Sequence, residues 1–153
     1  MNDTFMIGER KVSGHLKQRY NKISMMNPAY SKAIKLIFCI IVPTVLFHVC
    51  IVLKIIPYHI TWGGKLKNDT DMYVFESVTI LLNLFFLWVV SMKGDIVSFK
   101  FSGRTLNIIL WGYLILFSIN TIGSLFAETL FEKLFLFITL LLAIAIWKIL
   151  KKK

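Results

Sequence analysis

The chain of 153 residues is 57% apolar and only 17% charged, and its formal charge at pH 7 is +10. Soluble domains carry about 25% charged residues and fewer than half apolar ones. A soluble domain with this composition could not bury most of its apolar side chains beneath a polar surface. The composition therefore excludes an ordinary soluble domain. The positive charge indicates nucleic-acid binding only if it gathers on one face, so its place along the chain has to be found first.

A basic segment, residues 1–32, comes before the first apolar run. Within it, Ser13–Met26 fits a short amphipathic helix with Leu16, Tyr20 and Ile23 on one side. Such a helix would bind anionic lipids, and the alternative is a solvated tail; the pattern leaves both open. The basic residues expected to meet those lipids are Arg10, Lys11, Lys17, Arg19 and Lys22.

Four apolar runs follow, each close to the roughly 20 residues that a helix needs to cross a bilayer. They are too long and too continuously apolar for the strands of a membrane barrel. Because the backbone must satisfy its own hydrogen bonds in lipid, they predict an all-α integral membrane four-helix bundle. The spans are 33–56, 72–92, 105–127 and 129–150, in one domain over 33–150, followed by a basic tail at 151–153.

The first run contains both cysteines and a proline. Cys39 and Cys50 are separated by about 16 Å of helix, too far for a disulfide, and are expected to be packing residues. Pro43 is expected to kink the helix, with Thr44 repairing part of the loss, and Pro57 to end it. No cleavage pattern follows, so this span is expected to remain as an anchor.

The loop after the first span has the most distinctive composition. Gly63-Gly64 suits a tight reversal, and Asp69 or Thr70 suits the cap of the next helix. These roles leave several polar and aromatic side chains that could line an outward-facing ligand site. They are His59, Trp62, Lys65 and Glu76.

Depth along the helices places further polar groups in the half of the bundle next to this loop. At 1.5 Å per residue, His48, Asn120 and Thr139 lie at similar depths on three spans, while Asn83 lies near the middle of the second. Polar side chains in lipid face the protein interior. These polar side chains would either line a polar site or form hydrogen bonds that link neighbouring helices. The second interpretation is favoured for Asn83 and Asn120.

Basic residues are distributed unequally between the two sides of the predicted bundle. Fourteen lysines and arginines fall before span one, between spans two and three, or around the end of span four, and four fall in the other loops. By the positive-inside rule, this predicts that both termini are cytoplasmic. The net charge then reflects orientation, and no nucleic-acid partner is expected.

Motifs for catalysis and for cofactors do not occur in the sequence. No C-x-x-C, Walker loop, G-x-G-x-x-G, H-E-x-x-H or G-x-S-x-G is present, so neither a cofactor nor a metal site is expected. Glu76 is interpreted as a helix-capping carboxylate near the membrane interface. An enzyme acting on a lipid or quinone would need Glu76 and His48 within about 10 Å of each other as acid and base.

Several stretches together resemble uncharacterised small four-span proteins of bacterial inner membranes, over about 34–150. The resemblance implies a bacterial cytoplasmic membrane and four spans, and it carries no activity. The stretches are Pro57-Tyr58, Thr61-Trp62-Gly63-Gly64-Lys65-Leu66, Met72-Tyr73-Val74-Phe75-Glu76, Ile119-Asn120-Thr121-Ile122-Gly123 and Phe131-Glu132-Lys133.

These observations favour a binding or accessory subunit with a polar outward-facing half-bundle. The first alternative is a small transporter or channel that works as an oligomer. A transporter would resemble the small four-span multidrug exporters, although Glu76 is predicted too near the interface for a close match. The second is the membrane-embedded enzyme described above. Gly123 and Ala127 form a small-residue pair that is compatible with a homo-oligomer.

Overall fold

A computed structural model describes residues 28–58, 66, 68–98, 101–126 and 130–151. They form four helices, α2 (Pro28–Val52), α3 (Asp69–Lys93), α4 (Gly103–Leu125) and α5 (Leu130–Leu150). Each contains a stretch long and apolar enough to cross a membrane. The predicted all-α four-helix bundle is confirmed, and it fits a small multi-pass membrane protein. The proposed amphipathic helix at Ser13–Met26 lies outside the described residues.

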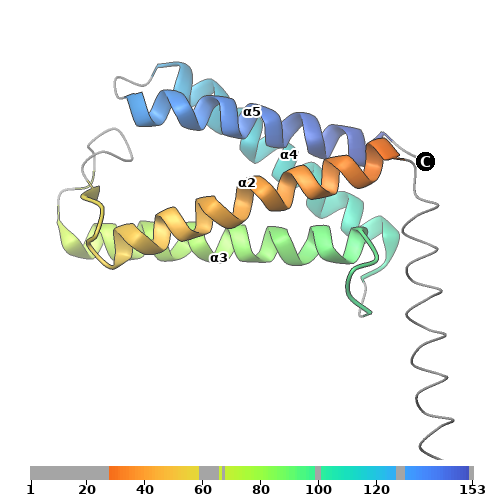
Figure 1. Cartoon of the computed structure of the whole chain (residues 1–153), viewed down its shortest axis with the longest axis horizontal. Coiled ribbons are helices and arrows are strands. Elements are labelled where there is room, and N and C mark those ends of the chain that lie inside the picture. Colours follow the sequence, from red (N-terminus) through yellow and green to blue (C-terminus); the bar gives the residue numbers. More distant parts are fainter. Residues whose placement is uncertain (1–27, 59–65, 67, 99–100, 127–129, 152–153) are drawn as a thin grey trace, which may run out of the picture.

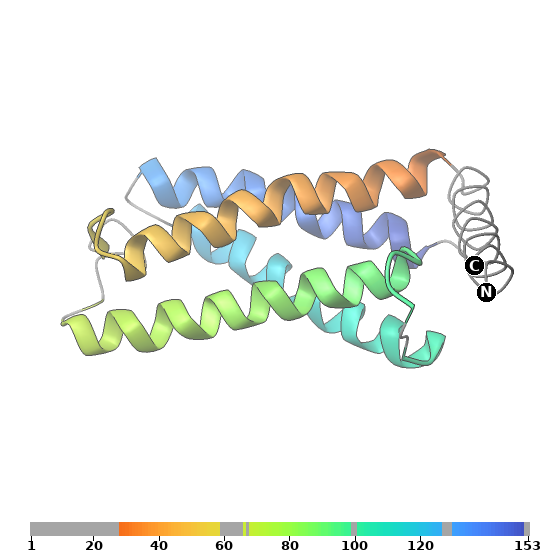
Figure 2. The ribbon, with the colours of Figure 1, turned by 60° about the horizontal axis from the view of Figure 1, so that its bottom comes forward.

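The four helices alternate in direction, so that each end of the bundle gathers two helix starts and two helix ends (Figure 1). At the end that we call the Lys93 end, α2 and α4 begin and α3 and α5 finish. At the opposite end, the Asp69 end, α3 and α5 begin and α2 and α4 finish. Figure 2 shows the same arrangement from a second side.

The main core fills the Lys93 half of the bundle and draws on all four helices. Phe86 of α3 is fully buried there, with its ring 4.6 Å from that of Tyr113 and 5.4 Å from that of Phe117 on α4. The Tyr113 hydroxyl donates to the carbonyl of Leu82 at 2.8 Å. A smaller apolar cluster at the Asp69 end contains Ile51, Leu66 and Met72.

Helix ends explain where sequence and structure differ by a few residues. α2 ends at Val52, before Pro57, because Lys54 takes a left-handed φ of 58°. Its N–H donates to Ile51 and that of Ile55 to Cys50, which is the Schellman pattern of C-terminal capping. The prediction that Pro57 ends the first helix is therefore wrong.

The interior of α2 follows the prediction in part. The helix continues through Pro43, and the Thr44 hydroxyl donates to the carbonyl of Ile40 at 2.9 Å. The hydrogen bond from Thr44 goes to Ile40. It therefore leaves the carbonyl of Cys39 without the backbone donor that Pro43 lacks. Cys39 and Cys50 are free thiols, as their separation predicts. Cys39 is exposed on α2, so the expectation that both cysteines are packing residues is wrong for Cys39.

α3 begins at Asp69 and is capped by Asn68, whose side-chain oxygen accepts from the N–H of Asp71 at 2.8 Å. The prediction of Asp69 or Thr70 as the cap is wrong by one or two positions. Asp69 and Asp71 instead supply negative charge to the first turn, where it offsets the positive end of the helix dipole.

Replacing Asn68 by alanine is expected to lower the free energy of unfolding by about 1 kcal/mol, because the first turn of α3 loses its capping acceptor. Asn68→Asp keeps an acceptor and should be close to the wild type. Unfolding of the purified protein in detergent, followed by helical circular dichroism, measures both. Equal stability of the alanine and wild-type chains would contradict this role for Asn68.

Candidate functional site

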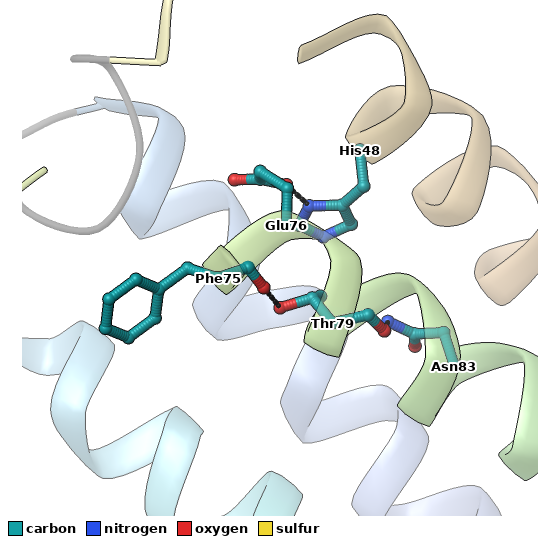
Figure 3. Close-up of polar contacts among 5 residues, drawn as sticks. All are labelled: His48, Phe75, Glu76, Thr79 and Asn83. Atoms are coloured by element: carbon teal, nitrogen blue, oxygen red, sulfur yellow. Dashed lines mark hydrogen bonds and ion pairs between the residues drawn. The ribbon is translucent and has the colours of Figure 1, made fainter. Parts of the chain in front are cut away.

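A hydrogen-bonded pair of ionisable side chains joins α2 to α3 inside the Asp69 half of the bundle (Figure 3). His48 Nδ1 lies 2.5 Å from Glu76 Oε2. The Glu76 side chain is completely buried, and His48 is 7% exposed. The two groups are thus in direct hydrogen-bond contact and lie well within the separation of about 10 Å beyond which they could not act together as acid and base.

The interpretation of Glu76 as an interfacial capping residue is wrong. α3 begins three residues earlier than predicted, so Glu76 lies about 10 Å along the helix from its start. Asn68 performs the capping, and the Glu76 carboxylate points toward α2 rather than toward solvent (Figure 3).

The pair forms because α2 and α3 run antiparallel and meet at successive turns. Outermost, Lys54 contacts Asp69; one turn deeper, Ile51 packs in the same cluster as Met72. The next turn brings His48 against Glu76. The register of the two helices therefore sets the contact between the two buried groups.

Aromatic side chains from α2 and α5 enclose the imidazole on its other side. The His48 ring lies 5.7 Å from that of Phe47 and 6.3 Å from that of Phe135, and the two phenyl rings lie 5.6 Å apart. In such apolar surroundings a lone charge is costly. Each of the two groups supplies the hydrogen-bond partner that the other needs in these surroundings.

A second polar contact joins α4 to α5 in the same half of the bundle. The Thr121 and Thr139 hydroxyl oxygens lie 2.8 Å apart, and each also lies within hydrogen-bond distance of a carbonyl one turn back on its own helix. Because each hydroxyl has one proton, the threonine that donates to the other gives up its bond to the carbonyl. Thr139 was placed by sequence at this depth. Thr121 was not singled out, and only its position beside Asn120 could have indicated it.

The asparagines do not make the contacts that were expected to link helices. The Asn83 amide nitrogen donates to the carbonyl of Thr79 on its own helix, at 2.9 Å (Figure 3). Asn120 is exposed on α4. His48 with Glu76, and Thr121 with Thr139, link the helices instead. His59, Trp62 and Lys65 lie outside the described residues.

Near the end of α2, Lys54 Nζ lies 2.5 Å from Asp69 Oδ2 and 5.8 Å from the centre of the Tyr73 ring. The hydrogen bond to Asp69 raises the pKa of Lys54 above its usual 10.5. On the alkaline side, a raised lysine pKa means that the contact is kept up to pH 10.5 and is lost only as pH rises through the higher value. Both side chains are half exposed, so the ion pair contributes little to stability.

Within the described residues, no three histidine, cysteine, aspartate or glutamate side chains gather as metal ligands. Comparisons with protein-family models, with curated proteins and with solved structures found no match. The function is therefore inferred from the chemistry and position of the side chains themselves.

Proposed function

We propose that this chain is a multi-pass protein of a bacterial cytoplasmic membrane that binds an amphipathic molecule from the outer leaflet, either alone or as the accessory subunit of a larger complex. The Asp69 end faces outward and both termini face the cytoplasm. The charge bias supports this orientation, and the resemblance to small four-span inner-membrane proteins supports the location. The N-terminal basic residues, among them Arg10 and Lys17, contact anionic lipids.

The buried His48–Glu76 pair is the observation that carries the proposal. Two charges taken out of water cost about as much as they gain from each other, and two apolar residues of similar size often stabilise a fold more. A binding site, more than a simple anchor, depends on helices that are held in one arrangement. The best-attested benefit of a buried polar contact is that it specifies one arrangement of the elements it joins.

The pair acts here as a positioning device. A hydrogen bond between His48 and Glu76 requires one rotation and one register of α3 on α2, whereas two leucines would pack in several. Thr121 and Thr139 do the same for α4 on α5. Polar groups that these contacts leave exposed, such as Asn120, remain in the outward half to meet a ligand.

Mass spectrometry of small molecules that co-purify with the protein in mild detergent tests this function. The wild type and Glu76→Gln, which keeps a hydrogen bond to His48, should retain the same bound molecule. The double variant His48→Leu with Glu76→Leu should fold and lose it, and Lys54→Ala serves as the matched control. Retention of the molecule by the double variant, or no bound molecule in any of the proteins, would overturn the proposal.

A second candidate, proton-coupled transport, is favoured because two ionisable side chains are in hydrogen-bond contact inside the predicted membrane spans. Proton-coupled transport predicts that the pH inside reconstituted vesicles falls as substrate moves across the membrane. Glu76→Gln should abolish this proton flux while the protein keeps its bound molecule. An acid–base enzyme is not proposed, since the fully buried Glu76 side chain is closed to a substrate.

The orientation gives a separate prediction. In a chain whose native cysteines are replaced by serine, Thr70→Cys at the Asp69 end should react with a membrane-impermeant maleimide added to intact cells. Lys151→Cys at the other end should react only after the cells are permeabilised. The reverse pattern would contradict the positive-inside assignment.

A further inference from the structure

Helices α3 and α4 contact each other in the Lys93 half of the bundle. There Lys93 Nζ donates to Asn107 Oδ1 at 2.6 Å, and the Phe86 ring packs on that of Tyr113. Nearest the Asp69 end, the Tyr113 hydroxyl reaches the carbonyl of Leu82. Beyond this point the two helices diverge in both views (Figures 1 and 2).

Burial along α3 records the same divergence. At about 100° per residue, Phe75, Val78 and Leu82 lie on the side of α3 that also carries Phe86 and Val89. Phe86 and Val89 are fully buried, whereas Phe75, Val78 and Leu82 are 46%, 51% and 43% exposed. One stripe of α3 is thus covered in the Lys93 half and uncovered in the Asp69 half.

The facing stripe of α4 changes in the same way. Tyr113 and Phe117 contact Phe86 and are 7% and 6% exposed. The next positions on this side, at helical spacing, are Asn120, which is exposed, and Ser124, which is half-buried. Polar groups therefore replace apolar ones where the cover of α3 ends.

The two polar contacts of the candidate site lie in the half of the bundle where α3 and α4 diverge. His48–Glu76 keeps the outer part of α3 on α2, and Thr121–Thr139 keeps the outer part of α4 on α5. The exposed and half-buried side chains on the facing sides of α3 and α4 in this half are here called the α3–α4 face. This face consists of Phe75, Val78, Leu82, Asn120 and Ser124.

We propose that the α3–α4 face binds one lipid molecule that enters sideways from the outer leaflet. Its acyl chain lies along Phe75, Val78 and Leu82, and its ester or hydroxyl groups meet Asn120 and Ser124. Asn120 is about 8 Å from the end of α4, the depth at which a lipid changes from polar to apolar groups. An amide both donates and accepts, so it suits an uncharged ester or hydroxyl.

This inference rests on the proposed function for the orientation of the bundle and for the class of ligand. A lipid is favoured over a second copy of the chain because the face combines an apolar stripe on one helix with hydrogen-bonding groups on the other. The open space around Gly112 and Gly123, which a helix dimer would use, lies on a different side of α4 from Asn120, toward Leu116 and Ile119.

Photo-crosslinking in vesicles tests the placement. The probe is a phosphatidylethanolamine that carries a diazirine on one acyl chain, and cross-linked peptides are mapped after illumination. Labelling of residues 75–82 should exceed that of Ile108 and Ile115, which face ordinary lipid. In Asn120→Leu this excess should fall about threefold, because one membrane hydrogen bond contributes ~0.6 kcal/mol. Ile122→Ala, an exposed neighbour, should leave it unchanged.

A second variant makes the test independent of Asn120. Val78→Trp fills the face with a bulky side chain and should also remove the excess labelling. Equal labelling of residues 75–82 and Ile115 in the wild type would overturn the inference, as would efficient disulfide formation between copies through Asn120→Cys. If the co-purified molecule is retained in Val78→Trp, the placement fails while the proposed function stands.

Discussion

Replacing Glu76 by alanine is expected to lower the free energy of unfolding by about 3–5 kcal/mol. The substitution removes the partner of a histidine that is 7% exposed and enclosed by Phe47 and Phe135. His48 would then be buried without its hydrogen-bond partner, or it would have to move out from between the helices. Unfolding in mixed detergent micelles, followed by helical circular dichroism, gives the free energy directly.

Two controls distinguish the cost of leaving one buried polar group without its partner from the cost of losing an exposed ion pair or of removing both buried groups. Lys54→Ala breaks an exposed ion pair near the end of the same helix and should change stability far less. The double variant His48→Leu with Glu76→Leu should be about as stable as the wild type or more so, since neither helix then buries a lone polar group. A single Glu76→Ala variant as stable as Lys54→Ala would contradict the energetic account.

The Phe86→Ala substitution should cost roughly 2–3 kcal/mol, the second large effect. Phe86 is fully buried and is the residue through which α3 packs on Tyr113 and Phe117. Lipid is as apolar as this core, so the loss comes chiefly from the cavity and its missing contacts rather than from transfer into water.

Phe85→Ala is the natural control for that substitution. Phe85 is the neighbouring residue on α3, has the same side chain and is 38% exposed, so its removal leaves a smaller cavity. The unfolding assay used for Glu76 should rank Phe86→Ala well below Phe85→Ala in stability. Similar losses in the two variants would mean that α3 does not pack on α4 through Phe86.

The fold could be predicted from the sequence because a bilayer imposes a simple rule on length and polarity. Four apolar runs gave four helices, and the observed bounds differ from the predicted ones by a few residues. The larger differences occur at helix ends, where local capping contacts determine the residue at which a helix begins or ends. Lys54 ends α2 ahead of Pro57, and Asn68 starts α3 early enough to move Glu76 inside the bundle.

Two residues of the candidate site could be selected from the sequence, whereas their contacts could not. His48 and Glu76 were both candidates because ionisable groups stand out in apolar spans. The rotation of each helix about its axis was not predictable, since lipid-facing and core-facing residues are equally apolar. This is why Thr121 rather than Asn120 links α4 to α5, and why Asn83 bonds within its own helix.

The distance between the outer parts of α3 and α4 tests the central claim, that His48–Glu76 holds α3 on α2 and thereby keeps the α3–α4 face uncovered. Double electron–electron resonance between spin labels at Val78→Cys and Ile119→Cys, in a chain whose native cysteines are replaced by serine, measures it in vesicles. With the native pair we expect one narrow distance distribution. With His48→Leu and Glu76→Leu we expect a broader one shifted to shorter distances, and an unchanged distribution would contradict the account.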